Sequence, residues 1–123
     1  MSGNKIFADT NILLYFLKGE QEIVEMISYK DVVISFITEL ELLSFPKILP
    51  ESEETIKGLL RNCLIVDLNQ EIKNLTIEFR KKSKLKLPDS IIAATCFYLK
   101  LPLITSDKQF RTIKEIELIM YEL

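Results

Sequence analysis

The sequence predicts a single α/β domain over residues 1–123, a three-layer α/β/α sandwich around a central parallel sheet of about five strands. Short apolar runs alternate with helical stretches along the chain, and this alternation favours a parallel sheet covered by helices on both faces. Only three glycines and four prolines occur in 123 residues, which argues against a loop-rich all-β fold. We find no linker, internal repeat or low-complexity segment, and the length suits one domain.

The N-terminal part of the chain predicts two strands separated by two helices. Residues 5–8 form the first strand, and a helix follows over residues 10–17. This helix ends near Gly19, because glycine is common just after a helix end. Residues 21–28 predict a second, short helix, and residues 32–35 are a β-branched run typical of a strand.

The middle of the chain alternates in the same way. Residues 37–45 predict a helix that ends before Pro46, because proline cannot continue a helix. Residues 51–62 have their apolar side chains on one side, as in an amphipathic helix. Residues 63–67 predict a third strand, and residues 70–84 a long helix.

The C-terminal part completes the pattern with one helix and two strands. Residues 88–99 predict a helix with Pro88 near its start, where the missing N–H is tolerated. Residues 103–105 and 118–121 predict the fourth and fifth strands.

Two acidic residues come just after predicted strands. Asp9 follows the first strand inside the apolar run IFADTNILLYF, and Asp107 follows the fourth strand. Ligands of parallel sheets bind at the carboxyl ends of strands, where the strand order reverses. If the first and fourth strands are neighbours, these two carboxylates face each other.

Four acids are candidate functional residues, and each also has a local structural explanation. Asp9 can be the N-cap of the helix that follows it, and Thr38-x-x-Glu41 matches a capping box. Asp89 and Asp107 stand at helix starts, where the helix dipole favours negative charge. These explanations do not account for the apolar neighbours of the acids, because surface caps usually have polar neighbours.

A cluster of carboxylates at one edge of a sheet is self-repelling, and a bound divalent cation relieves the repulsion. Oxygen ligands without histidine or cysteine suit Mg²⁺ or Mn²⁺. The chain has no histidine, which excludes Ser-His-Asp and Cys-His catalysis and zinc sites built on imidazole. Cys63 and Cys96 are too few for a disulfide framework, and we expect two reduced thiols in a cytoplasmic protein.

The charge distribution leaves two interpretations open. The net charge is −2, from 16 basic and 18 acidic residues, and by itself it does not indicate nucleic acid. Arg80, however, is followed by a dense group of lysines, at positions 81, 82, 84 and 86. This group is either the solvated end of a helix or an edge that contacts phosphates.

Three segments, ADTNILLYFLKG, ISFITELELLSF and LPDSIIAATCFYLKLPLITSDKQF, resemble the successive motifs of PIN-domain nucleases, especially toxin ribonucleases of the VapC type. The resemblance runs in order from about residue 6 to residue 110. Matched motif by motif, it implies that the active-site acids are Asp9, Glu41, Asp89 and Asp107. Helical phase leaves Glu39 open beside Glu41, so that choice rests on the resemblance alone.

The resemblance implies an endoribonuclease in which these four acids hold Mg²⁺ or Mn²⁺. The metal would activate a water that hydrolyses RNA phosphodiester bonds, leaving 5′-phosphate and 3′-hydroxyl ends. The expected supporting residues are Thr10, Asn11 and Ser106, and the expected RNA contacts are Lys81, Lys82, Lys84, Lys86 and Lys108. One departure is Gln109, where many relatives carry another acid, so a second metal site would have fewer ligands.

The resemblance also implies a small antitoxin partner and a homodimer. We expect exposed apolar side chains for such contacts around Ile23, Ile27 and Phe45. No apolar run approaches the roughly 20 residues of a membrane span, so no membrane contact is expected. Two alternatives remain: an inactive PIN-like interaction module, and an Asp-dependent phosphatase, which generally needs a second Asp where this chain has Asn11.

Overall fold

The computed structural model of the protein describes residues 4–45 and 50–122. Within them, a five-stranded sheet has the strand order β3-β2-β1-β4-β5, and all four strand pairs are parallel. The strands are β1 (Lys5–Ala8), β2 (Asp31–Ser35), β3 (Leu64–Val66), β4 (Leu103–Thr105) and β5 (Leu118–Met120). The predicted parallel α/β architecture is therefore confirmed.

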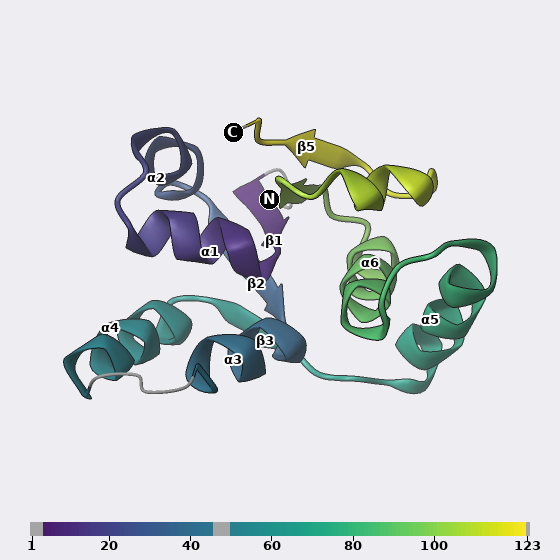
Figure 1. Cartoon of the computed structure of the whole chain (residues 1–123), viewed down its shortest axis with the longest axis horizontal. Coiled ribbons are helices and arrows are strands. Elements are labelled where there is room, and N and C mark those ends of the chain that lie inside the picture. The colour runs from purple at the N-terminus through teal and green to yellow at the C-terminus, as the bar shows by residue number, and fades with distance from the viewer. Residues whose placement is uncertain (1–3, 46–49, 123) are drawn as a thin grey trace.

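Helices cover both faces of this sheet (Figure 1). They are α1 (Thr10–Leu17), α2 (Gln21–Ile27), α3 (Phe36–Leu43), α4 (Pro50–Arg61), α5 (Gln70–Lys82), α6 (Leu87–Leu99) and the 3-10 helix η2 (Lys108–Thr112). Neighbouring residues of β1 point to opposite faces: Phe7 packs in the core with α5 and α6, and Ile6 in the core with α1, α2 and α4. The sheet is thus the middle of three layers.

The strand order reverses beside β1. The chain runs outward from β1 through β2 to β3, and then returns to place β4 on the other side of β1. Phe7 pairs with Leu103 and Ala8 with Ile104, so the first and fourth strands are neighbours. Their carboxyl ends lie together at the point where parallel sheets bind ligands.

Every predicted element occurs within two residues of its expected ends, and α3 and α5 each end two residues early. Helix α5 ends at Lys82 instead of residue 84, because Ser83 adopts extended backbone angles. The chain then inserts Leu85, which is 3% exposed, into the core beside Phe110. The lysines at 84 and 86 consequently lie on a loop and not on a helix. Pro46, the predicted stop for α3, lies outside the described residues.

Two expectations about apolar exposure are wrong. Ile23 and Ile27 are fully or almost fully buried, because α2 packs this pair into the core with α1. Phe45 is 40% exposed, as expected. In α3, the helix that carries Glu41, only Thr38 and Leu42 are buried.

The apolar helix α6 and the two cysteines are buried or partly buried. Helix α6 buries every residue from 90 to 96, so it is central to the fold. Both cysteines are free, and burial raises the pKa of the Cys63 thiol to about 11 and that of the Cys96 thiol to about 12. None of the helices in the described residues has the length and apolar character needed to cross a membrane.

Candidate active site

A cleft of about 410 Å³ lies at the carboxyl edge of the sheet, and all four candidate acids line it. Asp9 follows β1, Glu41 belongs to α3, Asp89 to the first turn of α6, and Asp107 follows β4. The other lining residues are Thr10, Asn11, Leu14, Ser44, Phe45 and Ile92. Four separate segments of the chain therefore bring carboxylates to one place.

Asp9 is both a helix cap and a buried acid. Its Oδ1 accepts a hydrogen bond from the backbone N–H of Ile12 at 3.1 Å, so the predicted N-cap is confirmed. The side chain is nevertheless only 5% exposed, which a surface cap would not require. Burial raises the pKa of Asp9 to about 6, and the charges of Asp107 and Asp89 add to this effect.

Thr105 is the residue that joins Asp9 to Asp107. Its buried hydroxyl donates to Asp9 Oδ2 and accepts from the backbone N–H of Asp107 at 3.0 Å. Asp107 Oδ1 in turn accepts from the N–H of Gln109 at 2.9 Å, and so caps η2. The sequence had suggested Ser106 for such a role. The signal that could have found Thr105 is a hydroxyl at the buried carboxyl end of the strand before Asp107.

The Glu41 carboxylate accepts a hydrogen bond from a hydroxyl at the start of α1. Thr10 Oγ1 donates to Glu41 Oε1 at 2.5 Å, and lies 3.0 Å from Thr38 Oγ1. Glu39, the alternative acid of this helix, is not among the residues that line the cleft. The capping-box interpretation of Thr38 is wrong: the helix starts earlier, at Phe36, with Ser35 as its N-cap, and Thr38 lies inside it.

The charges of two acids and one lysine act on the pKa of Asp89. Burial raises the pKa of Asp89, the charges of Asp107 and Glu41 raise it further, and the nearby Lys86 ammonium opposes the rise. Lys86 is the residue before α6, so this cation lies at the rim of the acidic cleft.

The donor set fits a hard divalent cation in its chemistry. Four carboxylates and no imidazole or thiol line the cleft. Burial raises the pKa of Asp9 and Asp89, and a cation would relieve the mutual repulsion that adds to this rise. In the part of the chain that the structure describes, however, no three acidic or cysteine side chains converge closely enough to form a ready metal cage. The carboxylate side chains would have to rotate before they could coordinate one cation together.

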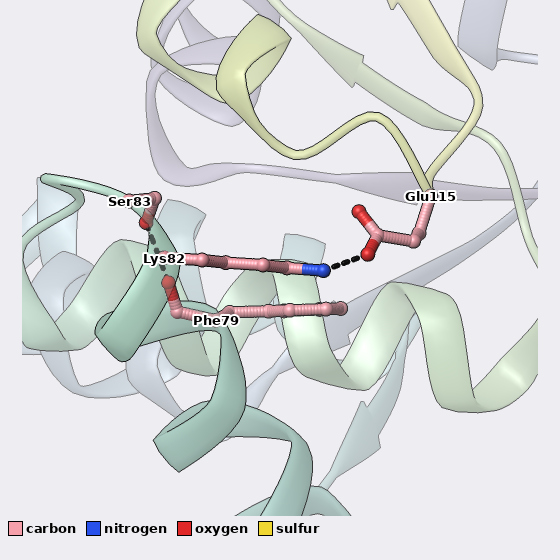
Figure 2. A network of polar contacts seen from close by, with 4 residues as sticks. All are labelled: Phe79, Lys82, Ser83 and Glu115. Carbon is pink, nitrogen blue, oxygen red and sulfur yellow. Dashed lines mark hydrogen bonds and ion pairs between the residues drawn. The ribbon is translucent and has the colours of Figure 1, made fainter.

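The five lysines predicted to contact RNA fall into different environments. Lys82 pairs with Glu115, and its Nζ lies 5.2 Å from the centre of the Phe79 ring. Figure 2 shows the Lys82 side chain extended along this ring with its ammonium directed at Glu115. Lys84, Lys86 and Lys108 are exposed on the segments beside Asp89 and Asp107, and Lys81 is exposed at the end of α5.

The fold and this site define an α/β protein that gathers four carboxylates at the reversal point of a parallel sheet. The PIN domain family matches residues 6–116, and this chain belongs to that family. A curated relative, Ribonuclease VapC2 from Methanocaldococcus jannaschii, is 32% identical over 97% of this chain and 95% of its own length.

Solved structures of toxin–antitoxin complexes contain similar chains. A toxin–antitoxin complex from Klebsiella pneumoniae has a chain that matches with a TM-score of 0.83 and 31% identity, over 96% of this chain and 99% of that chain. A chain of VapBC-1 from nontypeable Haemophilus influenzae matches with a TM-score of 0.82 and 26% identity, over 94% and 97% respectively. These similarities confirm the PIN-like three-layer fold.

Proposed function

We propose that this chain is a Mg²⁺- or Mn²⁺-dependent endoribonuclease and the toxin of a toxin–antitoxin pair. The observation that carries the proposal is the cleft in which Asp9, Glu41, Asp89 and Asp107 meet from four segments. A similar chain named a ribonuclease, Ribonuclease VapC2, supports RNA as the substrate.

Each acid has a distinct task in this proposal. Asp9 and Asp107, joined through Thr105, would form the rigid part of the ligand set, because both are tied to strand ends. Asp89 and Glu41 would close the set from α6 and α3. A divalent cation held there would lower the pKa of a coordinated water and neutralise charge on the scissile phosphate.

The supporting side chains orient the acids. The Thr10 hydroxyl fixes Glu41, and the Thr105 hydroxyl keeps one oxygen of Asp9 in place. Asn11 is an exposed residue of the cleft, and its amide could hydrogen-bond the phosphate or ribose of the substrate. The absence of histidine fits this scheme, since metal activation of water replaces an imidazole base.

The proposed partners follow from the same similarities. The matching solved structures are described as toxin–antitoxin and VapBC complexes, which supports a small antitoxin for this chain. Exposed apolar side chains are available for an antitoxin or for a second copy of the chain. They include Leu40, Phe45, Leu64, Leu68, Ile77 and Leu87. Light scattering of the purified chain, alone and with the product of the adjacent gene, would test both partners.

The activity is tested by incubating the full chain with end-labelled single-stranded RNA in Mg²⁺ or Mn²⁺. We expect cleavage to 5′-phosphate and 3′-hydroxyl ends, loss of cleavage in EDTA, and a loss of at least 100-fold in Asp89→Asn. Asp31→Asn, an exposed acid at the opposite end of the sheet, is the matched control and should cleave normally. Cleavage that persists in EDTA and in Asp89→Asn would refute the proposal.

A further inference from the structure

A second pocket near the acidic cleft shares no lining residue with it. It has a volume of about 300 Å³, and we call it the side pocket. Its lining residues are Lys84, Leu85, Gln109 and Thr112. Its size is at the lower end of the range for small-ligand sites, roughly 300–1,000 Å³.

The walls of the side pocket belong to two of the segments that also supply acids to the cleft. On one wall, Lys84 and Leu85 precede Asp89 in the loop that leads into α6. On the other wall, Gln109 follows Asp107 in η2, and the Asp107 carboxylate accepts a hydrogen bond from the Gln109 N–H at 2.9 Å. The side pocket therefore lies near the acids, within the stretch of chain that an RNA bound at the cleft would approach.

Core packing and hydrogen bonds anchor the backbone of both pocket walls. The side chains of Lys84, Gln109 and Thr112 are nevertheless exposed. Leu85 is buried in the core with Phe110, and its N–H donates to Ser83 Oγ at 3.3 Å. On the other wall, Thr112 Oγ1 donates to the backbone oxygen of Gln109 at 2.8 Å. Because the backbone on both sides is anchored, the pocket exists before any ligand enters.

The charges near the pocket favour an anionic ligand. Lys84 and Lys86 are exposed on either side of the buried Leu85. Lys86 stands at the cleft beside Asp89, and Lys84 lines the side pocket. In the part of the chain that the structure describes, neither lysine has an ion-pair partner, whereas Lys82 is paired with Glu115. Two cations thus lead from the acids toward the side pocket.

Gln109 adds the capacity to recognise a base. Its amide offers hydrogen-bond donors and an acceptor side by side, which can pair with the edge of an unstacked nucleobase. The aliphatic stem of Lys84 supplies apolar surface for the ring. Gln109 lines this pocket and is not among the residues that line the acidic cleft.

We propose that the side pocket binds the nucleotide next to the scissile phosphate, with Lys84 contacting a phosphate and Gln109 reading the base. The proposal rests on the ribonuclease function proposed above and specifies how that site selects RNA. It predicts that the enzyme prefers one base, or a subset of bases, at one position flanking the cut.

The test compares Gln109→Ala and Lys84→Ala with the parent chain. Lys30→Ala is the control, because Lys30 is exposed and precedes β2 at the opposite end of the sheet. Each protein cleaves a single-stranded RNA library with randomised positions, and the cut sites are sequenced. Gln109→Ala should relax the preference at one flanking position by roughly fivefold or more, and the control should retain it.

A binding measurement separates this proposal from the ribonuclease function. Fluorescence anisotropy with a labelled single-stranded RNA is recorded in the Asp89→Asn background, which leaves the RNA intact. Lys84→Ala should reduce the slope of log affinity against log salt by about 0.7, the value for one phosphate contact on a single strand. Circular dichroism checks that each variant is folded.

The outcomes are distinct. If the parent chain cuts RNA but Gln109→Ala and Lys84→Ala behave like Lys30→Ala, the side-pocket proposal is overturned and the ribonuclease function stands. If the parent chain neither cuts nor binds RNA, both proposals fail. Binding that depends on Lys84 and Gln109 in a chain that never cuts RNA refutes the nuclease, and overturns the assignment of the pocket to the nucleotide beside a scissile phosphate.

Discussion

Thr105 donates a hydrogen bond to Asp9 across 96 positions of the sequence, and so ties the carboxyl end of β4 to that of β1. The same hydroxyl accepts the N–H of Asp107. A single buried side chain thus fixes the distance between two of the four acids. The strand pairing alone would bring Asp9 and Asp107 to one edge, and Thr105 sets their relative orientation.

Replacing Thr105 with valine should disturb Asp9 while keeping the shape of the side chain. The substitution removes a hydrogen bond that lowers the pKa of Asp9, so that pKa should rise above about 6. Leaving a buried carboxylate oxygen without its partner should destabilise the fold by about 1–3 kcal/mol at neutral pH. Urea unfolding and an NMR titration of the Asp9 carboxyl would measure the two effects.

Thr105→Ser is the control for this prediction, because it keeps the hydroxyl. Its Asp9 pKa should stay close to that of the parent chain, even if the lost methyl group lowers stability somewhat. An unchanged pKa in Thr105→Val would contradict the role assigned to the hydroxyl.

Asp9 should also make stability fall as the pH rises. Its pKa is about 6 in the folded chain against an ordinary value of 3.8, so the folded state binds the proton more tightly than the unfolded state. The free energy of unfolding therefore decreases between about pH 4 and pH 6, by roughly 3 kcal/mol for this group. Asp9→Asn lacks this contribution and should gain stability relative to the parent chain across that range.

Urea unfolding in EDTA at several pH values between 4 and 7 would test this dependence. Asp31→Asn, which changes an exposed acid, should follow the parent chain throughout. If the curves of Asp9→Asn and the parent chain ran parallel, Asp9 would not be the buried titrating group that the structure indicates.

Glu41 and Glu39 offer a matched comparison on one helix. Both belong to α3, but only Glu41 lines the cleft and receives the Thr10 hydrogen bond. Binding of Mn²⁺ to the folded chain should raise its melting temperature, by an amount that corresponds to about 2.7 kcal/mol at 100 times Kd. Glu41→Gln should shrink this shift at a fixed Mn²⁺ concentration, and Glu39→Gln should leave it intact.

Thermal unfolding of the three proteins with and without Mn²⁺ gives the comparison directly. Equal shifts in Glu41→Gln and the parent chain would remove Glu41 from the ligand set. A reduced shift in Glu39→Gln alone would assign the role to the other acid.

The sequence predicted the architecture well because strand and helix periodicity is a local signal. The bounds of β1, α1 and β4 match the expected residues, and the neighbouring positions of β1 and β4 place Asp9 beside Asp107. The four acids were found from their motifs together with their apolar neighbours, and all four line one cleft. The structure adds their geometry, and their roles as ligands remain a prediction.

Features that depend on distant contacts were missed or misjudged. Thr105 looks like an ordinary strand residue in the sequence, because its partner Asp9 is far away along the chain. The exposure expected for Ile23 and Ile27 was wrong, because helical periodicity does not say which neighbour will cover an apolar face. The Lys82–Glu115 pair likewise joins residues that no local pattern connects.

That pair leads to a prediction about RNA binding. Lys86 is exposed at the cleft beside Asp89, whereas Lys82 is held by Glu115 and lies over Phe79 (Figure 2). Lys86→Glu should therefore weaken binding of single-stranded RNA to the Asp89→Asn chain, and should reduce the slope of log affinity against log salt by about 0.7 or more. Lys82→Glu makes the same change of charge, but its effect on the slope should be clearly smaller.

Anisotropy titrations at several salt concentrations measure both slopes. Equal slopes in the two variants would mean that net charge, and not the position of Lys86 at the cleft, governs the attraction of RNA.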